Sequence, residues 1–203
     1  PVRNEEGSLG KLIESIRAQT CLPDEVILVE DGPLPAELKD VIEAYRERIN
    51  IVSVTLTHNC GLAVALNEGL RHCRHDLVAR MDSDDISKPG RFERLVSYLD
   101  REPTCAAVSS NCEYFTSPAA RRGTSTVSTH PRQIAFEIRH GLRGLIQGAA
   151  CFRISALVNV GGYREQFRAA EDADLFLRLS ERFELGNVPE YLYRIRATPT
   201  SRS

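Results

Sequence analysis

Three aspartates follow a short apolar run near the middle of the chain. Residues 77–81 read Leu-Val-Ala-Arg-Met, and Asp82, Asp84 and Asp85 come directly after them. The run predicts a strand, and an open α/β sheet binds its ligands beyond the carboxyl ends of its strands. Asp82 and Asp84 stand one residue apart, so their carboxylates can converge on one hard cation. Mg²⁺ takes one or two protein carboxylates and completes its shell with water and substrate phosphates. We therefore interpret the pair as a metal–diphosphate site.

Two other interpretations of these acids compete with a metal–diphosphate site. An isolated Asp-x-Asp is also typical of a solvated acidic turn, with Asp84 or Asp85 starting a helix. This alternative stays open on the motif alone. A calcium-binding EF-hand loop does not fit, because Ile86 and Ser87 stand where an oxygen ligand and a glycine are required.

A second group of acids stands late in the chain, in the segment Glu171-Asp172-Ala173-Asp174. It opens an amphipathic helical pattern that continues through Leu175 to Phe183. Acids in a first helical turn are favourable to the helix dipole, which is one explanation for them. A carboxylate held at a helix start and facing a cleft is the other, and the pattern does not decide between the two.

The elements that must position these acids alternate between strands and helices. Apolar runs predict strands at 25–29, 51–56 and 77–81. Helical periodicity lies between them at 8–19, where Ser8 is a plausible cap, and at 34–49, and a loop at 58–61 runs into a third helix. This β-α-β-α-β order indicates a parallel, doubly wound sheet.

The rest of the chain changes character. The pattern predicts a helix at 89–101 and a strand at 105–115, followed by a polar surface loop at 116–129. Beyond that loop we expect a helix at 131–139, a strand at 147–153, a short helix at 155–160 and the helix that begins at Glu171.

The composition is that of one ordinary soluble domain. The chain has 203 residues, of which 42% are hydrophobic and 27% charged. The formal charge of −2 gives no basic field for nucleic acid. No run approaches the ~18 apolar residues of a membrane span, and no signal peptide is visible. Six scattered cysteines without a C-x-x-C pair favour reduced core thiols in a cytoplasmic protein.

Read together in this order and spacing, eight short motifs resemble those of the family 2 inverting glycosyltransferases, which have the GT-A fold. The motifs are Pro1-Val2-Arg3-Asn4-Glu5, Val29-Glu30-Asp31-Gly32, Asn59-x-Gly61-Leu62-Ala63-x-Ala65-x-Asn67-x-Gly69, Ala79-Arg80-Met81-Asp82-Ser83-Asp84-Asp85, Phe152-Arg153, Val160-Gly161-Gly162-Tyr163, Glu171-Asp172-x-Asp174-Leu175 and Tyr193-Arg194-x-Arg196. The resemblance implies a Rossmann-like, mostly parallel sheet flanked by helices.

The resemblance also implies roles for particular residues. Asp82 and Asp84 would bind Mg²⁺ or Mn²⁺, and Asp172 would be the catalytic base. Arg194 or Arg196 would clamp phosphate, or would simply lie on a surface strand. The expected nucleotide-sugar site comprises Pro1, Val2, Arg3, Asn4, Glu5, Glu30, Asp31, Asn59, Gly61, Asn67, Arg80, Asp82 and Ser83, with Asp31 and Glu30 on the base or ribose.

The expected function is transfer of a sugar from a nucleoside-diphosphate sugar, most simply a UDP-sugar, to an acceptor hydroxyl with inversion. The setting would be bacterial-type cell-surface polysaccharide or lipopolysaccharide synthesis, with a saccharide or lipid-linked saccharide as acceptor. We expect a cytoplasmic protein, with peripheral association at the inner face of the membrane as a further expectation. Residues 1–203 would form a single domain, with the donor site in 1–115 and the acceptor site and base in 116–203.

Two other functions are weighed against this one. A sugar-phosphate nucleotidyltransferase would need a Gly-rich loop with a basic residue after the first strand, which residues 4–7 (Asn-Glu-Glu-Gly) do not supply. A non-catalytic nucleotide-sugar-binding domain would have no need to retain both the Asp82/Asp84 pair and Asp172.

The chain also departs from the family pattern. The central first strand expected before Pro1 is missing, so neighbouring strands would expose hydrogen-bonding edges, and we interpret the sequence as a fragment. Thr198 and Thr200 stand where a His and a Gly are usual, which puts a ligand contact there in doubt.

Overall fold

The computed structural model describes residues 7–117, 120–142 and 144–197. The predicted nucleotide contacts Pro1, Val2, Arg3, Asn4 and Glu5 lie outside these ranges, as do Thr198 and Thr200. No helix in the described ranges is long and apolar enough to cross a bilayer.

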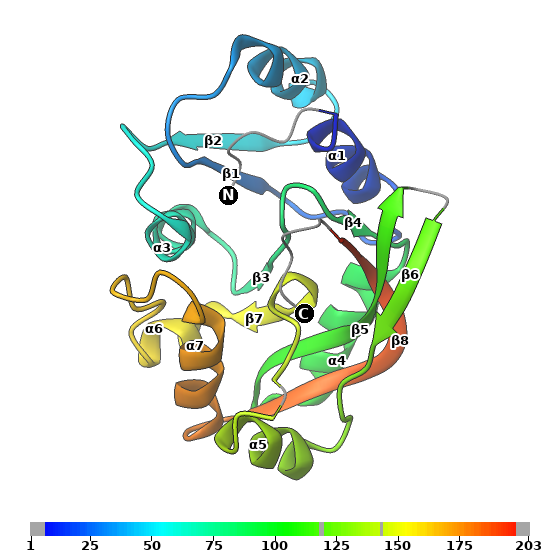
Figure 1. The fold of residues 1–203 in the computed structure, drawn as a ribbon, viewed down its shortest axis with the longest axis vertical. Coiled ribbons are helices and arrows are strands. Elements are labelled where there is room, and N and C mark those ends of the chain that lie inside the picture. The colour runs from blue at the N-terminus through cyan, green and yellow to red at the C-terminus, as the bar shows by residue number, and fades with distance from the viewer. Residues whose placement is uncertain (1–6, 118–119, 143, 198–203) are drawn as a thin grey trace.

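The first part of the chain forms a two-stranded parallel sheet between helices (Figure 1). Strand β1 (Val26–Glu30) pairs in register with β2 (Ile51–Thr55), which confirms the predicted parallel β-α-β unit. Helices α1 (Leu9–Arg17) and α2 (Ala36–Arg46) lie on one side of the strands, and α3 (Leu62–His72) lies on the other. Helix α1 buries Leu9, Leu12, Ile13 and Ile16, the apolar face that its periodicity predicts.

The main sheet has six strands, and the prediction of a mostly parallel sheet is wrong for it. The order is β3-β7-β5-β8-β4, with β6 added on β5. Only β5 and β8 are parallel, and the other pairs are antiparallel. The strands are β3 (Leu77–Ala79), β4 (Ile86–Ser87), β5 (Cys105–Ser117), β6 (Ala120–Ser125), β7 (Cys151–Arg153) and β8 (Glu184–Arg196).

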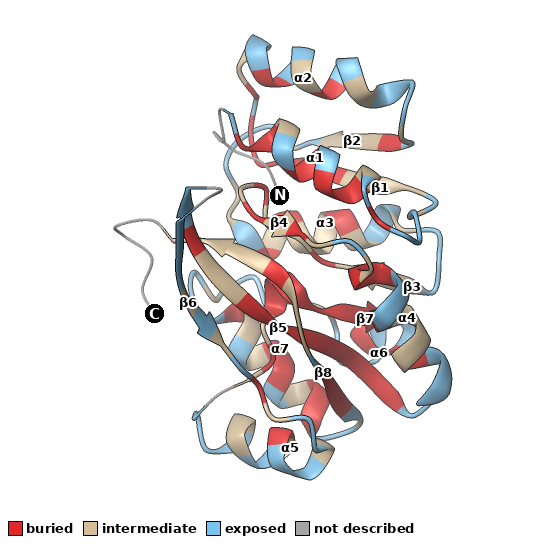
Figure 2. Cartoon of the chain, turned by 90° about the vertical axis from the view of Figure 1, so that its right-hand side faces the viewer, coloured by how far each residue is buried: buried red, intermediate tan, exposed pale blue. Residues whose placement is uncertain are grey.

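The main sheet also curls, and the curl follows the irregular pairing of its two longest strands. The β5–β8 ladder shifts register beside Ala107 and on both sides of Asn111. Extra residues of this kind bend a strand and increase its twist. Figure 2 shows β5 as a long, mostly buried strand, β8 as a long strand that is buried in part, and β6 as a mostly exposed edge strand.

Three local predictions need correction. The predicted loop at 116–129 contains β6, whose exposed polar side chains hide a backbone that pairs with β5. Residues 86–87, which lie outside every predicted strand, form β4, a two-residue strand that pairs with β8. In the predicted strand at 147–153, residues Gln147–Ala149 form a 3₁₀ turn and only Cys151–Arg153 is strand.

Two buried clusters lie against the main sheet. Helix α4 (Arg91–Arg101) packs Leu95 and Leu99 against β5 and β8 residues. The other cluster joins α5 (Pro131–Arg139), α6 (Ile154–Asn159) and α7 (Glu171–Ser180) around Phe152. The rings of Phe152 and Phe176 stack there with centroids 5.9 Å apart. This cluster anchors α7, and therefore the acids at its start.

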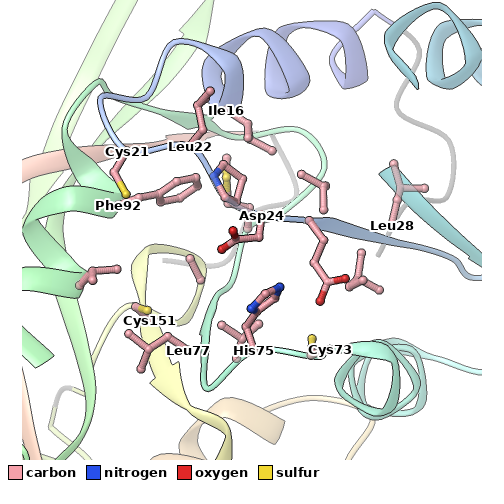
Figure 3. Close-up of a pocket in the computed structure, with 18 of the residues that line it drawn as sticks. Ile16, Cys21, Leu22, Asp24, Leu28, Cys73, His75, Leu77, Phe92 and Cys151 are labelled. Carbon is pink, nitrogen blue, oxygen red and sulfur yellow. The ribbon is translucent and has the colours of Figure 1, made fainter. Parts of the chain in front are cut away.

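A cavity of about 440 Å³ separates β1 from β3 (Figure 3). Its walls are mainly apolar and include Leu28 of β1 and Leu77 of β3, with Asp24 and His75 among the polar residues. Among the described strands, β1 pairs with β2 alone and β3 with β7 alone. Within the described ranges, no strand lies between β1 and β3.

We call the boundary between the two sheets, where β1 faces β3, the seam. Side-chain hydrogen bonds connect the two sheets across it. Gln19, at the end of α1, donates from Nε2 to the Lys88 carbonyl at 2.8 Å and accepts from the Phe92 N–H at 3.2 Å. Ser15 on the same helix accepts a hydrogen bond from the Ser87 N–H at 3.1 Å.

Cysteines are distributed between core and surface. Cys105, Cys112 and Cys151 are buried, as predicted for core thiols, but Cys21 is exposed and the other two are half-buried.

Candidate active site

The acid loop, residues 82–85, follows β3 and is held in place by β8. The Asp82 N–H donates to the Tyr193 hydroxyl at 3.0 Å, and Tyr193 is fully buried. The Arg196 N–H donates to Asp85 Oδ1 at 2.7 Å. In both hydrogen bonds the two residues are 111 positions apart in the chain. The conformation of the acid loop therefore depends on a distant strand, which the motif alone does not indicate.

Arg80 lies behind the acid loop and binds one of its carboxylates. Its Nη1 donates to Asp82 Oδ2, and the Arg80 side chain is only 8% exposed, against 39% for Asp82. Burial lowers the pKa of the Arg80 guanidinium, but the Asp82 carboxylate and nearby groups raise it by more than burial lowers it. The net pKa therefore lies above the usual range of arginine. Arg80 therefore stays cationic and bound to Asp82.

A second buried arginine, Arg91, supports the same backbone from α4. Its Nη2 donates to the Arg80 carbonyl at 2.8 Å and to the Gly148 carbonyl at 3.1 Å. Its guanidinium carbon lies 4.7 Å from the centre of the Tyr193 ring. Burial lowers the pKa of Arg91 to about 10. No local pattern distinguishes this arginine from a solvated one, so the sequence does not reveal it.

The carboxylates of the acid loop fit a cation whose coordination shell is completed by oxygens of the substrate. Asp82 and Asp84 offer hard carboxylate oxygens of the type that Mg²⁺ and Mn²⁺ prefer. Asp85 is 3% exposed, and burial, followed by the Asp82 charge, raises its pKa to about 7. Within the described ranges, no three His, Cys, Asp or Glu side chains gather into a closed metal cage. A site with one or two carboxylates is the arrangement that Mg²⁺ uses with diphosphates.

The start of α7 lies beside the acid loop. Burial raises the pKa of the Glu171 carboxyl, and the charges of Arg80 and Asp82 also act on it, so these groups share one environment. Asp172 is half-buried, and its Oδ1 accepts the Ala173 N–H at 2.8 Å. Ala170, immediately before them, has a left-handed φ of 60°. A strained residue of this kind is often found where the chain is held for function.

Tyr163 joins the same neighbourhood. Burial raises its pKa to about 12, and the charges of Arg80 and Asp172 act on it as well. The turn that carries Tyr163 therefore links the arginine behind the acid loop to the first turn of α7.

The third acid of the α7 first turn is committed elsewhere. Asp174 forms ion pairs with Arg178 at 2.6 Å and with Arg164 at 3.0 Å. Its side chain is 10% exposed, so two guanidinium groups occupy it in a poorly solvated position. Among Glu171, Asp172 and Asp174, the structure thus leaves Asp172 as the acid that is neither buried nor ion-paired within the described residues.

The predicted base- or ribose-binding acids lie at the end of β1. Glu30 Oε2 accepts the Thr55 hydroxyl at 3.0 Å, and Asp31 Oδ1 accepts the Cys60 N–H at 2.7 Å. The Asp31 bond draws the loop that carries Asn59 and Gly61 against the strand end. Contacts among the described residues connect these two acids to β2 and to the loop after it, not to the acid loop.

Two further predicted nucleotide contacts are turned toward protein. Asn67 donates from Nδ2 to the Tyr163 carbonyl at 2.8 Å and accepts the Tyr163 N–H at 2.9 Å. Ser83 is 7% exposed and faces the cavity between β1 and β3. Asn67 and Ser83 thus contact other parts of the protein, and their contact with a nucleotide stays a prediction.

The two arginines considered for a phosphate clamp differ in their surroundings. Arg196 Nε donates to the Asp84 carbonyl at 3.2 Å, so its side chain borders the acid loop. Both guanidinium groups lie over the Phe115 ring, at 4.7 Å from the centroid for Arg194 and 5.1 Å for Arg196, and Arg194 also sits 3.8 Å from Glu113. The Arg196 contact places that side chain beside the predicted metal ligands.

Comparison with known proteins gives matches over most of the chain. The family described as "Glycosyl transferase family 2" matches residues 1–161. The UDP-Gal:alpha-D-GlcNAc-diphosphoundecaprenol beta-1,3-galactosyltransferase of Escherichia coli is 34% identical over 170 residues, covering 84% of this chain and 61% of the relative. The amylovoran biosynthesis glycosyltransferase AmsE of Erwinia amylovora is 34% identical over 195 residues, covering 94% of this chain and 71% of the relative.

Solved structures share the fold. S. aureus TarS 1–349 in complex with UDP-GlcNAc superposes with a TM-score of 0.80 at 18% identity, covering 99% of this chain and 58% of that one. The mannosyltransferase PcManGT from Pyrobaculum calidifontis, in complex with GDP-Man and Mn²⁺, gives a TM-score of 0.74 at 20% identity, covering 98% and 56%. The chain thus spans roughly three fifths of the length of the E. coli relative and of both structures.

Proposed function

Because this chain belongs to glycosyl transferase family 2, we propose that it transfers a sugar from a UDP-sugar to the hydroxyl of a saccharide or lipid-linked saccharide, with inversion, in the synthesis of a bacterial cell-surface polysaccharide. The names of the relatives support the setting. The E. coli relative is named for a diphosphoundecaprenol-linked acceptor, and the Erwinia relative for amylovoran biosynthesis.

The observation that carries the proposal is the meeting of two acidic segments far apart in the chain. The acid loop after β3 and the first turn of α7 share one electrostatic environment around Arg80. Two acids that could hold a metal, beside a carboxylate with no ion pair among the described residues, would supply the groups that an inverting transfer requires.

The donor half of the mechanism belongs to the acid loop. Asp82 and Asp84 would hold Mg²⁺ or Mn²⁺, and a bound ion would neutralise charge that develops on the leaving nucleoside diphosphate. Arg196 would add a positive charge at the same edge. Glu30 and Asp31 would bind the base or ribose from the end of β1. Residues 1–115 would thus supply most of the donor site, and 116–203 the acceptor side.

The acceptor half belongs to Asp172. Its carboxylate would accept the proton of the acceptor hydroxyl while that oxygen attacks the anomeric carbon. The new C–O bond forms on the face opposite the departing UDP, which gives inversion. A positioned general base of this type contributes about 10²–10⁴-fold. Asp174 is ion-paired with two arginines, whereas half-buried Asp172 has no ion pair among the described residues, and this difference supports the choice.

Calorimetry of UDP binding tests the donor half. UDP should bind more tightly with Mn²⁺ than without it, because several acids would otherwise repel the diphosphate. Asp84→Asn should remove most of this gain. Equal affinity with and without Mn²⁺, or full retention of the gain in Asp84→Asn, would rule out the metal role.

Release of UDP in the presence of a lipid-diphosphate-linked saccharide tests the base. Asp172→Asn should lower kcat by about 10²–10⁴-fold while UDP affinity stays unchanged, because the amide is nearly isosteric but cannot take the proton. Asp174→Asn is the matched control and should lower stability rather than the chemical step. If Asp172→Asn turns over normally and Glu171→Gln is dead, the base is Glu171.

A further inference from the structure

Arg80 was expected among the nucleotide contacts, yet its side chain is only 8% exposed and its guanidinium donates to Asp82. We propose that Arg80 is a positioning residue, which fixes one oxygen of Asp82 so that the other is presented to a divalent cation. This inference rests on the proposed metal–diphosphate site. It assigns to Arg80 an action through Asp82 instead of direct contact with the donor.

The backbone of Arg80 is held from two sides. Its N–H donates to the Ala150 carbonyl at 2.9 Å, and its carbonyl accepts from Arg91 Nη2 at 2.8 Å. Arg91 is itself fully buried. The guanidinium of Arg80 therefore projects from a fixed point, and its contact with Asp82 transmits that rigidity to the acid loop.

Asp82 is in turn held at both its backbone and its side chain. The N–H is bound to the Tyr193 hydroxyl, and Oδ2 is bound to Arg80. None of the described residues donates a hydrogen bond to its Oδ1, and the side chain is 39% exposed. An ionised carboxylate has about four lone-pair sites on two oxygens. The arginine therefore occupies part of this capacity and leaves room for a cation.

Gly148 lies directly against this ion pair, at a position where only a residue without a side chain fits. A Cβ atom at this position would lie 2.9 Å from Asp82 Oδ2, 3.0 Å from the Tyr193 ring and 3.1 Å from Arg80 Nη1. Three groups would have to move to admit a methyl group. The glycine thus keeps the arginine and the aspartate in the one arrangement that the structure shows.

Electrostatic repulsion alone would give Arg80 the opposite effect on metal affinity, since a bound guanidinium repels a cation. Geometry favours the supporting role, because hydrogen-bonded partners of ligating carboxylates usually strengthen metal binding. Loss of such a partner typically weakens metal affinity about 10–100-fold. The experiment below separates the two signs.

The test is direct measurement of Mn²⁺ binding, by the electron paramagnetic resonance signal of free Mn²⁺, with UDP and without it. Arg80→Met should raise the Kd of Mn²⁺ about 10–100-fold. Arg80→Lys, which keeps the charge, should recover part of the affinity. Arg153→Met is the matched control, because Arg153 donates to the carbonyls of Cys105 and Leu99 and touches no acid of the loop. Its Kd should stay at the wild-type value.

Gly148→Ala perturbs the Arg80–Asp82 ion pair by steric contact, without removing a polar group. Its added methyl should displace Asp82 or Arg80 and weaken Mn²⁺ binding, which keeps the proposal testable if Arg80→Met does not fold. Wild-type affinity in either folded variant overturns the positioning role. Tighter binding in Arg80→Met also overturns it, by making the arginine a competitor of the metal. If the wild-type protein binds no Mn²⁺ even with UDP, the proposed metal site itself fails, and this inference with it.

Discussion

Replacing Asn67 with alanine should reduce the free energy of unfolding by about 2 kcal/mol, because two backbone groups lose their partner. The amide of Asn67 bonds the Tyr163 carbonyl at 2.8 Å and the Tyr163 N–H at 2.9 Å, across 96 residues of chain. Tyr163 is 4% exposed. Each buried group left without a partner costs about 1–3 kcal/mol. Asn67 itself is half-buried, so water can reach part of the gap and the lower end applies.

A double-mutant cycle with Gly162 makes the prediction specific. Gly162 has a φ of +67°, and a Cβ there would lie 2.8 Å from Asn67 Oδ1. Gly162→Ala therefore carries the strain of left-handed backbone, about 1–2 kcal/mol, and also a clash that pushes the amide from its partners. Only the backbone strain remains once Asn67 is alanine. The two changes should couple by at least ~1 kcal/mol.

Urea unfolding followed by far-UV circular dichroism measures both effects, since the chain contains no tryptophan. The expected loss in Asn67→Ala corresponds to a Tm about 4–8 °C lower for a chain of this size. Asn50→Ala is the control, because the Asn50 amide makes a single exposed bond, to the Asp24 carbonyl at 3.0 Å. A loss in Asn67→Ala no larger than in Asn50→Ala, or an additive cycle, would refute the reasoning.

Three further outcomes are expected. Ala170→Gly should raise the free energy of unfolding by about 1 kcal/mol in urea, because glycine relieves the left-handed φ of 60°; a loss would contradict the strain. Burial raises the pKa of Cys105 to about 11 and of Cys151 to about 12, so both thiols stay protonated at pH 8. Iodoacetamide should therefore label exposed Cys21 and leave these two unlabelled. Equal labelling of the three cysteines would contradict this. Arg91→Ala should destabilise the protein by about 3 kcal/mol or more, because it leaves a cavity and unpaired carbonyls; near-native unfolding in urea would refute it.

Local patterns predicted the elements that fold on their own periodicity. Helix α5 begins and ends where the sequence placed it, at Pro131–Arg139, and β1 and β2 pair as the β-α-β order implies. Strand β4 was not predicted because its two residues are defined by long-range pairing. Strand β8 was considered only as a surface strand at Arg194 and Arg196, and it contains Pro189 beside an interrupted ladder. Strand β6 escaped for another reason, since its exposed polar side chains read as a loop.

The candidate site divides in the same way. Asp82 and Asp172 stood out in the sequence because acids at a strand end or helix start have a recognisable chemistry. The support beneath them did not. Arg91 and Gly148 matter only because the fold brings them to Arg80, and the sequence carries no mark of that contact. The i,i+4 spacing of Asp174 and Arg178 on a predicted helix is compatible with their ion pair, but nothing in the spacing indicates the second ion pair, with Arg164.

The seam between β1 and β3 has a consequence for the stiffness of the molecule. Within either sheet, backbone ladders resist sliding and separation along their whole length, whereas the described contacts across the seam are packing and single side-chain bonds such as those of Gln19. Among the described residues, Asp31 after β1 and Asp82 after β3 are therefore connected across the seam by packing and side-chain hydrogen bonds, and not by a continuous backbone ladder.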